Sequence, residues 1–325
     1  MSRKLLTLSL TATLMGGTAH ADTLQVAVDI APVHSLVARV MDGVGMPDLI
    51  IQPGASPHEY SLRPSEAAAL QNSDLVFWIG PGLTPWLTDT IETLAKDASV
   101  TSLLDLDGTV QLDFREGALF EVHDHDDHDD HDDHDDHDDH DDHDDHDDHD
   151  DHDDHDDHDP HAWLSPKNAI TWLNVIAGQL SAADPDNAGT YFANAAAGRT
   201  EIELLISEVT ATLDRVRGGR FIVFHDAYQY FEMDFNFPAS GAISVSDASD
   251  PGPARITEIR DRISQQGIDC VLAEPQFNPD LIATILDGTD SRTGIIDPLG
   301  SDLEPGASLY RELIRNLSTA LASCM

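Results

Sequence analysis

Histidine is the side chain with the clearest potential for chemistry in this sequence of 325 residues, which contains 18 histidines. Thirteen of them lie between residues 123 and 159, in a tract made only of histidine and aspartate, and His20 lies in the first segment. Neutral imidazole nitrogens bind zinc at about 2.0 to 2.1 Å, often with a fourth position left to a carboxylate or water. The histidines that remain as candidates for such a site are His34, His58, His161 and His225.

Two of these histidines lie in loops that directly precede predicted helices. His58 belongs to the segment PGASPHEYSLRPSE, between a predicted strand that ends at Ile51 and a helix predicted to begin near Pro64. His161 belongs to DPHAWLSP, just before a helix predicted to begin at about Pro166. Both contexts favour presentation of a side chain at the surface of a cleft.

His225 directly follows an apolar run that predicts a strand, and Asp226 is predicted to cap the next helix. Loops at the carboxyl ends of parallel strands converge on one crevice, so the three histidines are predicted to bind a single metal ion there. Glu59, next to the first histidine, is the predicted fourth ligand. Asp297, in IIDPLG at another strand end, and water are the alternatives.

Two further residues that could bind a metal ion are predicted to have structural roles instead. His34 follows Pro32 at the start of an apolar helix, so we expect it to be part of the packing. Glu274, in AEPQF at the end of a predicted strand, is expected to support the cleft through an ion pair or by lining it.

The elements that must position these residues alternate between strand and helix. Between the short apolar runs, apolar residues recur three and four positions apart, as in 33–40 and 256–263. The pattern predicts an α/β fold with parallel sheets flanked by helices. The predicted strands are 24–28, 48–51, 75–79, 100–103, 221–224, 270–273 and 294–296.

A long segment from Pro185 to Arg217 contains no internal proline, and its apolar residues follow helical spacing. As one helix it would be about 50 Å long and would join two lobes as a spine. The alternative is two ordinary helices with a break near Gly198. The predicted organisation is therefore an N-terminal lobe at 22–183, a spine at 184–217 and a C-terminal lobe at 218–325.

The first 21 residues read as a secretory signal peptide. Basic residues at the start precede an apolar run and small residues that end at Ala21. No segment is long and apolar enough to span a bilayer, so we expect an exported, soluble protein of the periplasm. An oxidising compartment favours a disulfide between Cys270 and Cys324, the two cysteines of the chain, and the alternative is two separate buried thiols.

The tract at 123–159 repeats the triplet HDD and offers no apolar side chain to bury, which predicts a disordered insertion. Its imidazoles and carboxylates suit zinc and similar divalent ions, whereas a solvated acidic spacer is the plainer interpretation. Its 24 aspartates account for more than half of the formal net charge of −44. Such an acidic chain is unsuited to nucleic acid and favours a cationic ligand.

Several segments together resemble one family. GASPHEYSLRPSE, DPHAWLSP, VFHDAYQYFE, CVLAEPQF and DPLG look like the corresponding segments of the zinc-specific, ZnuA-type members of the cluster A-1 substrate-binding proteins. The resemblance covers the mature chain and implies two α/β lobes joined by one long helix, with metal between them. The family's ligands carry over to His58, His161 and His225, and its glutamate ligand to Glu59. A disulfide like that of Cys270 and Cys324 also occurs in some members.

The resemblance implies a monomeric zinc carrier of the periplasm rather than an enzyme. It would capture Zn²⁺ as the transported ligand and deliver it to the membrane permease of an ABC importer. Manganese-binding relatives place a carboxylate where this chain has His225, and a third imidazole favours the softer ion. A manganese carrier or adhesin of the same fold is one alternative. A secreted zinc hydrolase is the other, since three histidines and an open position can activate water, although no HExxH pair occurs.

Overall fold

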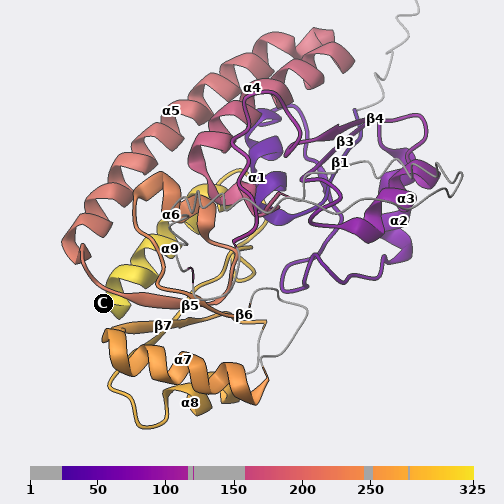
Figure 1. Cartoon of the computed structure of the whole chain (residues 1–325). Coiled ribbons are helices and arrows are strands. Elements are labelled where there is room, and N and C mark those ends of the chain that lie inside the picture. Colours follow the sequence, from indigo (N-terminus) through magenta and orange to yellow (C-terminus); the bar gives the residue numbers. More distant parts are fainter. Residues whose placement is uncertain (1–23, 116–119, 121–157, 245–251, 277–278) are drawn as a thin grey trace, which may run out of the picture.

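Two parallel sheets of four strands each, joined along one side by a long helix, form the framework of the protein (Figure 1). The computed structural model describes residues 24–115, 120, 158–244, 252–276 and 279–325. The predicted fold class is therefore confirmed. The predicted signal peptide and tract residues 123–157 lie outside the described residues.

The first sheet has the strand order β2-β1-β3-β4 and all its pairs are parallel. Every residue of β3 is buried, as expected for an interior strand of a sheet that helices cover on both faces. The predicted strands are found with shifts of one or two residues at their ends. The elements of this lobe are β1 (Val26–Val28), α1 (Ala31–Val40), β2 (Asp48–Leu49), α2 (Pro64–Asn72), β3 (Leu75–Trp78), α3 (Pro85–Leu94), β4 (Ser99–Ser102) and α4 (Pro166–Ala183).

The second sheet has the order β6-β5-β7-β8, again parallel throughout. It includes one strand, β6, that the sequence patterns do not predict. The helices α7 and α8 lie along its outer side (Figure 1). The elements are β5 (Phe221–His225), α6 (Gln229–Phe235), β6 (Ala242–Ser244), α7 (Pro253–Gln266), β7 (Cys270–Ala273), α8 (Pro279–Leu286), β8 (Arg292–Ile295) and α9 (Leu309–Cys324).

Alternating side chains of β5 separate the apolar interior into two clusters. Phe221 and Val223 belong to a large cluster that also contains buried residues of the first lobe and of α5 and α9. Ile222 and Phe224 belong to a smaller cluster shared with α7 and α8. Because successive side chains of a strand point to opposite faces, His225 shares the face of Phe221 and Val223. The strand thus directs His225 toward the first lobe.

The spine of the molecule is α5 (Ala188–Leu213), which begins after a 3₁₀ turn at Pro185–Asn187 and continues into another at Asp214–Val216. The helix runs unbroken through Gly198, so the two-helix alternative is wrong. A Cβ at this position would lie 3.1 Å from Leu173 Cδ1, and glycine therefore permits close packing of α5 on α4. Among the described helices, this one included, none is long and apolar enough to cross a bilayer.

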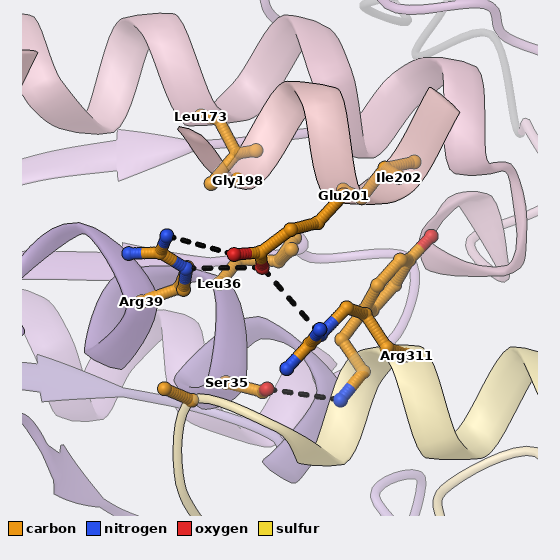
Figure 2. A pocket seen from close by; sticks show the side chains of 10 residues that line it. Ser35, Leu36, Arg39, Leu173, Gly198, Glu201, Ile202 and Arg311 are labelled. Carbon is orange, nitrogen blue, oxygen red and sulfur yellow. Dashed lines mark hydrogen bonds and ion pairs between the residues drawn. The ribbon is translucent and has the colours of Figure 1, made fainter. Parts of the chain in front are cut away.

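A partly exposed ion-pair cluster of Arg39, Glu201 and Arg311 joins the spine to both lobes (Figure 2). Glu201 of α5 accepts two hydrogen bonds from Arg39 of α1, at 2.9 and 3.1 Å, and lies 3.5 Å from Arg311 of α9. The cavity between these side chains has a volume of about 10 Å³, room for roughly one water molecule. This pocket is therefore a packing gap at the junction of α1, α4, α5 and α9, and its size excludes a larger ligand.

A disulfide between Cys270 and Cys324 joins the first residue of β7 to the last residue of α9. The predicted pairing is confirmed, and the alternative of separate thiols is wrong. The two cysteines are 54 positions apart, so the crosslink removes a large amount of conformational entropy from the unfolded chain.

Replacing both cysteines by alanine is expected to lower the free energy of unfolding by up to about 4 kcal/mol. Urea denaturation followed by circular dichroism measures this difference. A thiol reductant should lower the free energy of unfolding of the parent protein by a similar amount. Equal midpoints for the oxidised parent and the double variant would contradict a stabilising role for the disulfide.

Candidate metal centre

The register of the second sheet brings His225 and Glu274 together. Val223 pairs with Leu272 across β5 and β7, so the residues two positions further along both strands are neighbours on the same face. The Nδ1 atom of His225 lies 2.6 Å from Glu274 Oε1. Both residues are buried, with exposed fractions of 3%. The predicted supporting role of Glu274 thus corresponds to a direct contact with a candidate ligand.

His161 has a matching carboxylate from its own segment. It precedes a 3₁₀ turn at Ala162–Leu164, and Asp159 Oδ1 accepts a hydrogen bond from the His161 backbone N–H at 2.9 Å. The same oxygen lies 2.7 Å from His161 Nδ1. The indole ring of Trp163 packs beside the imidazole, with ring centroids 5.2 Å apart, and its Nε1 donates to the carbonyl of Pro298 at 2.8 Å. His161 therefore lies where the two lobes are in contact.

His58 lies in the loop between β2 and α2, and its side chain is half-buried. The preceding carbonyl, that of Pro57, accepts a hydrogen bond from Trp86 Nε1 at 2.8 Å. Beyond the histidine, Glu66 Oε1 accepts from the Tyr60 hydroxyl at 2.9 Å and Glu66 Oε2 accepts from the Arg63 backbone N–H at 2.7 Å. The second bond is part of a capping arrangement at the start of α2. Both sides of the loop are thereby held.

The three predicted histidine ligands are neighbours in space. The ring centroids of His58 and His161 are 5.8 Å apart, and those of His161 and His225 are 5.4 Å apart. His161 is thus the middle ring. Within the described part of the chain, no group of three or more His, Cys, Asp or Glu side chains is already arranged to hold a metal ion. The rings are therefore adjacent but not yet closed around a common centre.

The two carboxylates assign the tautomers of their histidines. When these carboxylates are ionised they only accept hydrogen bonds, and the Nδ1 atoms of His161 and His225 then carry the protons. The lone pair for a metal then belongs to Nε2 of each ring. Carboxylate–imidazole pairs of this kind orient metal-binding histidines in many proteins.

The two candidates for an oxygen ligand differ in their surroundings. Glu59 has an exposed side chain next to His58. Asp297 accepts backbone hydrogen bonds from Leu299, Gly300 and Ser301 at 2.6 to 3.0 Å, and the Ser301 hydroxyl also donates to it. Its two oxygens therefore stabilise the loop that follows β8. Glu59 remains the predicted fourth ligand.

Burial dominates the electrostatics of the carboxylates at this site. It raises the pKa of Asp159 to about 7, although the His161 backbone N–H and the charge of Arg115 act in the opposite direction. It also raises the pKa of Glu274, which the interaction with His225 partly offsets. Buried carboxylates that face imidazoles favour a cation in the same place.

The chain is similar to known proteins of zinc uptake. The family model described as zinc-uptake complex component A, periplasmic (ZnuA) matches residues 26–324. The chain belongs to the ZnuA family. The high-affinity zinc uptake system protein ZnuA of Brucella abortus (strain 2308) is 50% identical over 304 residues, which cover 92% of this chain and 91% of the relative. ZnuA of Paracoccus denitrificans (strain Pd 1222) is 48% identical over 308 residues, covering 94% and 93%.

Solved structures show the same ZnuA fold. A crystal structure of ZnuA superposes with a TM-score of 0.71 at 20% identity and covers 93% of this chain and 99% of its own. Family membership and fold thus agree, and members of the ZnuA family are periplasmic components of zinc-uptake complexes. The family is one of transport components that bind a substrate.

His34 has the structural role expected from the sequence: its side chain is buried, and its Nε2 lies 3.0 Å from the carbonyl oxygen of Pro47. The prediction for Asp226 is wrong. The helix α6 begins only at Gln229, with Tyr228 at its N-cap, and Asp226 instead pairs with Arg115. Asp226 therefore acts as an ion-pair partner of Arg115 rather than as a helix cap.

Sequence reasoning missed two residues of the site. Arg115 is largely buried and forms ion pairs with Asp226 and with Glu232, the latter at 2.8 Å. Its guanidinium stacks on Phe120 at 3.5 Å from the ring centroid. Asp159 is the last aspartate of the HDD tract, yet only 1% of it is exposed. Its place two residues before His161 is the one signal that could have separated it from the other tract aspartates.

Proposed function

We propose that this protein captures Zn²⁺ in the periplasm through His58, His161 and His225 and delivers it to the membrane permease of an ABC-type zinc importer. The observation that supports this most strongly is that three imidazole rings from two lobes lie next to one another, with His161 between the other two. Membership of the ZnuA family supports the same function. The proposed signal peptide at 1–21 would export the chain.

The donor set favours zinc as the cargo. Three imidazole nitrogens and one oxygen suit a borderline ion that accepts tetrahedral coordination, whereas manganese prefers more oxygen ligands. We assign Nε2 of His161 and His225 as ligand atoms, since the carboxylates of Asp159 and Glu274 engage their Nδ1 atoms. Glu59 is the proposed oxygen ligand.

Any rearrangement on capture is proposed to be small, because the centroids of neighbouring rings are already only 5.4 and 5.8 Å apart. Zinc–nitrogen bonds of about 2.0 to 2.1 Å would draw the three imidazoles together. The ligands come from both lobes, so binding would tighten the contact between them. A carrier needs this property, since its partner must distinguish the loaded form from the empty form.

The HDD tract is proposed to act as an auxiliary collector of zinc. Its sites lack the fixed geometry of the centre, and each should bind more weakly. Many weak sites close to the centre nevertheless raise the local concentration of zinc. We propose binding and delivery as the whole activity of the chain, without catalysis.

Zinc affinity is expected to fall as the medium becomes more acidic than about pH 6.5, because imidazoles must be neutral to bind metal. Isothermal titration calorimetry at about pH 7.5 and about pH 5.5 measures the change. Titrations in two buffers of different ionisation enthalpy count the protons released on binding. Equal affinities at the two pH values, without proton release, would argue against histidine ligation.

A further inference from the structure

The chain segment that precedes the HDD tract is joined to the last residues of the tract beside the metal centre. Asp113 and His158 form an antiparallel bridge, and His158 Nδ1 lies 3.0 Å from Asp113 Oδ1. Next to this bridge, the backbone N–H of Asp159 donates to the carbonyl of Leu112 at 2.7 Å. The last two residues of the tract are therefore fixed to the segment at Leu112 and Asp113, and His161 lies only two residues beyond the tract.

Tyr230 of α6 connects both segments to the C-terminal lobe. Its hydroxyl accepts a hydrogen bond from the Leu112 backbone N–H at 3.0 Å and donates one to the carbonyl of Asp159 at 2.7 Å. The tyrosine is fully buried. Gln229, with its amide nitrogen turned toward them, donates to Asp159 Oδ2 and to the carbonyl of Asp113, both at 3.2 Å. The start of α6 thus holds both the segment at Leu112 and Asp113 and the last residue of the tract.

The side chain of Asp159 carries this connection to the metal centre. One of its oxygens contacts both the backbone N–H and the Nδ1 atom of His161, and its backbone is held by Tyr230 and Leu112. The orientation of the middle imidazole is therefore set by an aspartate whose own position depends on a tyrosine of the other lobe. The same tyrosine lies five residues after His225, the ligand of that lobe.

We propose that Tyr230 and Asp159 are positioning residues for zinc binding: Tyr230 fixes the backbone of Asp159, and Asp159 fixes His161 Nε2 toward the metal. The same hydroxyl accepts a hydrogen bond from Leu112, and Asp159 is the last residue of the HDD tract, so the tract ends at the part of the fold that orients the middle ligand. The inference rests on the proposed zinc site. Partners of metal-bound histidines typically contribute 10- to 100-fold to affinity, so roughly that loss is expected for Asp159 variants.

The test compares zinc affinity, zinc dissociation rate and the visible spectrum of bound Co²⁺ for the full chain and its variants. Asp159→Asn should lower zinc affinity by roughly 10- to 100-fold, and Tyr230→Phe should lower it by a smaller factor. Both should alter the Co²⁺ spectrum, which reports ligand geometry rather than overall stability. Tyr191→Phe is the matched control, since this buried tyrosine donates to Asp184 at 2.8 Å beyond the end of α4.

A double-mutant cycle separates a relay from two independent effects. Tyr230→Phe should change affinity little in an Asp159→Ala background, because its effect passes through the missing carboxylate. Independent effects of the two substitutions would overturn the relay. Should the alanine variant fail to fold, Asp159→Asn and Tyr230→Phe alone decide: parental affinity and an unchanged Co²⁺ spectrum in both would refute the proposal. Tight zinc binding by His161→Ala would instead refute the proposed function.

Discussion

The His161→Ala variant is expected to lose tight zinc binding, with affinity lowered by far more than the roughly 100-fold effect typical of a supporting residue. His161 is the middle one of the three rings, and it is the ring that neighbours both of the others. Its removal leaves two imidazoles on different lobes with no bridging ligand between them. Calorimetric titration with chelator competition measures the remaining affinity.

Two controls isolate the role of this ring. His34→Gln replaces a histidine that is hydrogen-bonded to Pro47 and lies outside the cluster, and its zinc affinity should match that of the parent. Deletion of tract residues 123–157 should remove weak sites and leave the tight one. The deletion must stop before His158, because Asp159 belongs to the centre. Retention of tight binding by His161→Ala, or its loss on deletion of the tract, would contradict the proposed ligand set.

The largest effect on stability is expected from Arg115→Met, which should lower the free energy of unfolding by about 3 to 5 kcal/mol. Arg115 is the cationic partner of Asp226 and Glu232, and both carboxylates are largely buried. Burial by itself would lower the pKa of the guanidinium, but the two carboxylates raise it overall. Without the arginine, both carboxylates would remain buried without their cation.

The destabilisation by Arg115→Met should depend on pH in a defined direction. Burial already raises the pKa values of Asp226 and Glu232, and loss of the arginine raises them further. A carboxyl group with a raised pKa in the folded state destabilises the fold where it is ionised, and this penalty disappears as pH falls and the group binds a proton. The difference between variant and parent should therefore be largest near neutral pH and smaller in acid.

Urea denaturation of both proteins at several pH values measures this dependence. Arg315→Met is a suitable control, since Arg315 pairs with Glu208 on the surface and the exposed pair should contribute less than about 1 kcal/mol. Equal losses for the two arginine variants, or a loss for Arg115→Met that grows in acid, would contradict the assignment of a buried ion-pair cluster.

The sequence was sufficient to predict the framework because the strands of parallel sheets are buried on both faces. Segments such as Leu75–Trp78 and Phe221–Phe224 are therefore continuous apolar runs. The strand β6 escaped detection because it has three residues and follows a loop rich in small residues. Helical spacing indicated the long helix but left open a break at Gly198. In the structure the helix continues through Gly198, which packs closely on Leu173.

The histidines of the site could be predicted because each follows or precedes a recognisable element, and Glu274 because it ends a strand. Arg115 could not, because its two carboxylate partners are 111 and 117 positions away in the sequence, and Asp159 could not, because it lies in a repetitive segment of many aspartates. The lone arginine before the tract gives no local sign of its two carboxylates. Contacts of this kind depend on how the lobes meet, which periodicity and spacing do not specify.

The most direct test of the account is a crystal structure of the zinc-loaded protein with anomalous data collected at the zinc absorption edge. We predict a strong peak between the lobes, bonded to His58, His161 and His225 at about 2.0 to 2.1 Å, with Nε2 as the ligand atom of the latter two. Asp159 and Glu274 should remain on the Nδ1 side of their rings. Zinc bound only by the HDD tract, with the three imidazoles separated from one another, would contradict it.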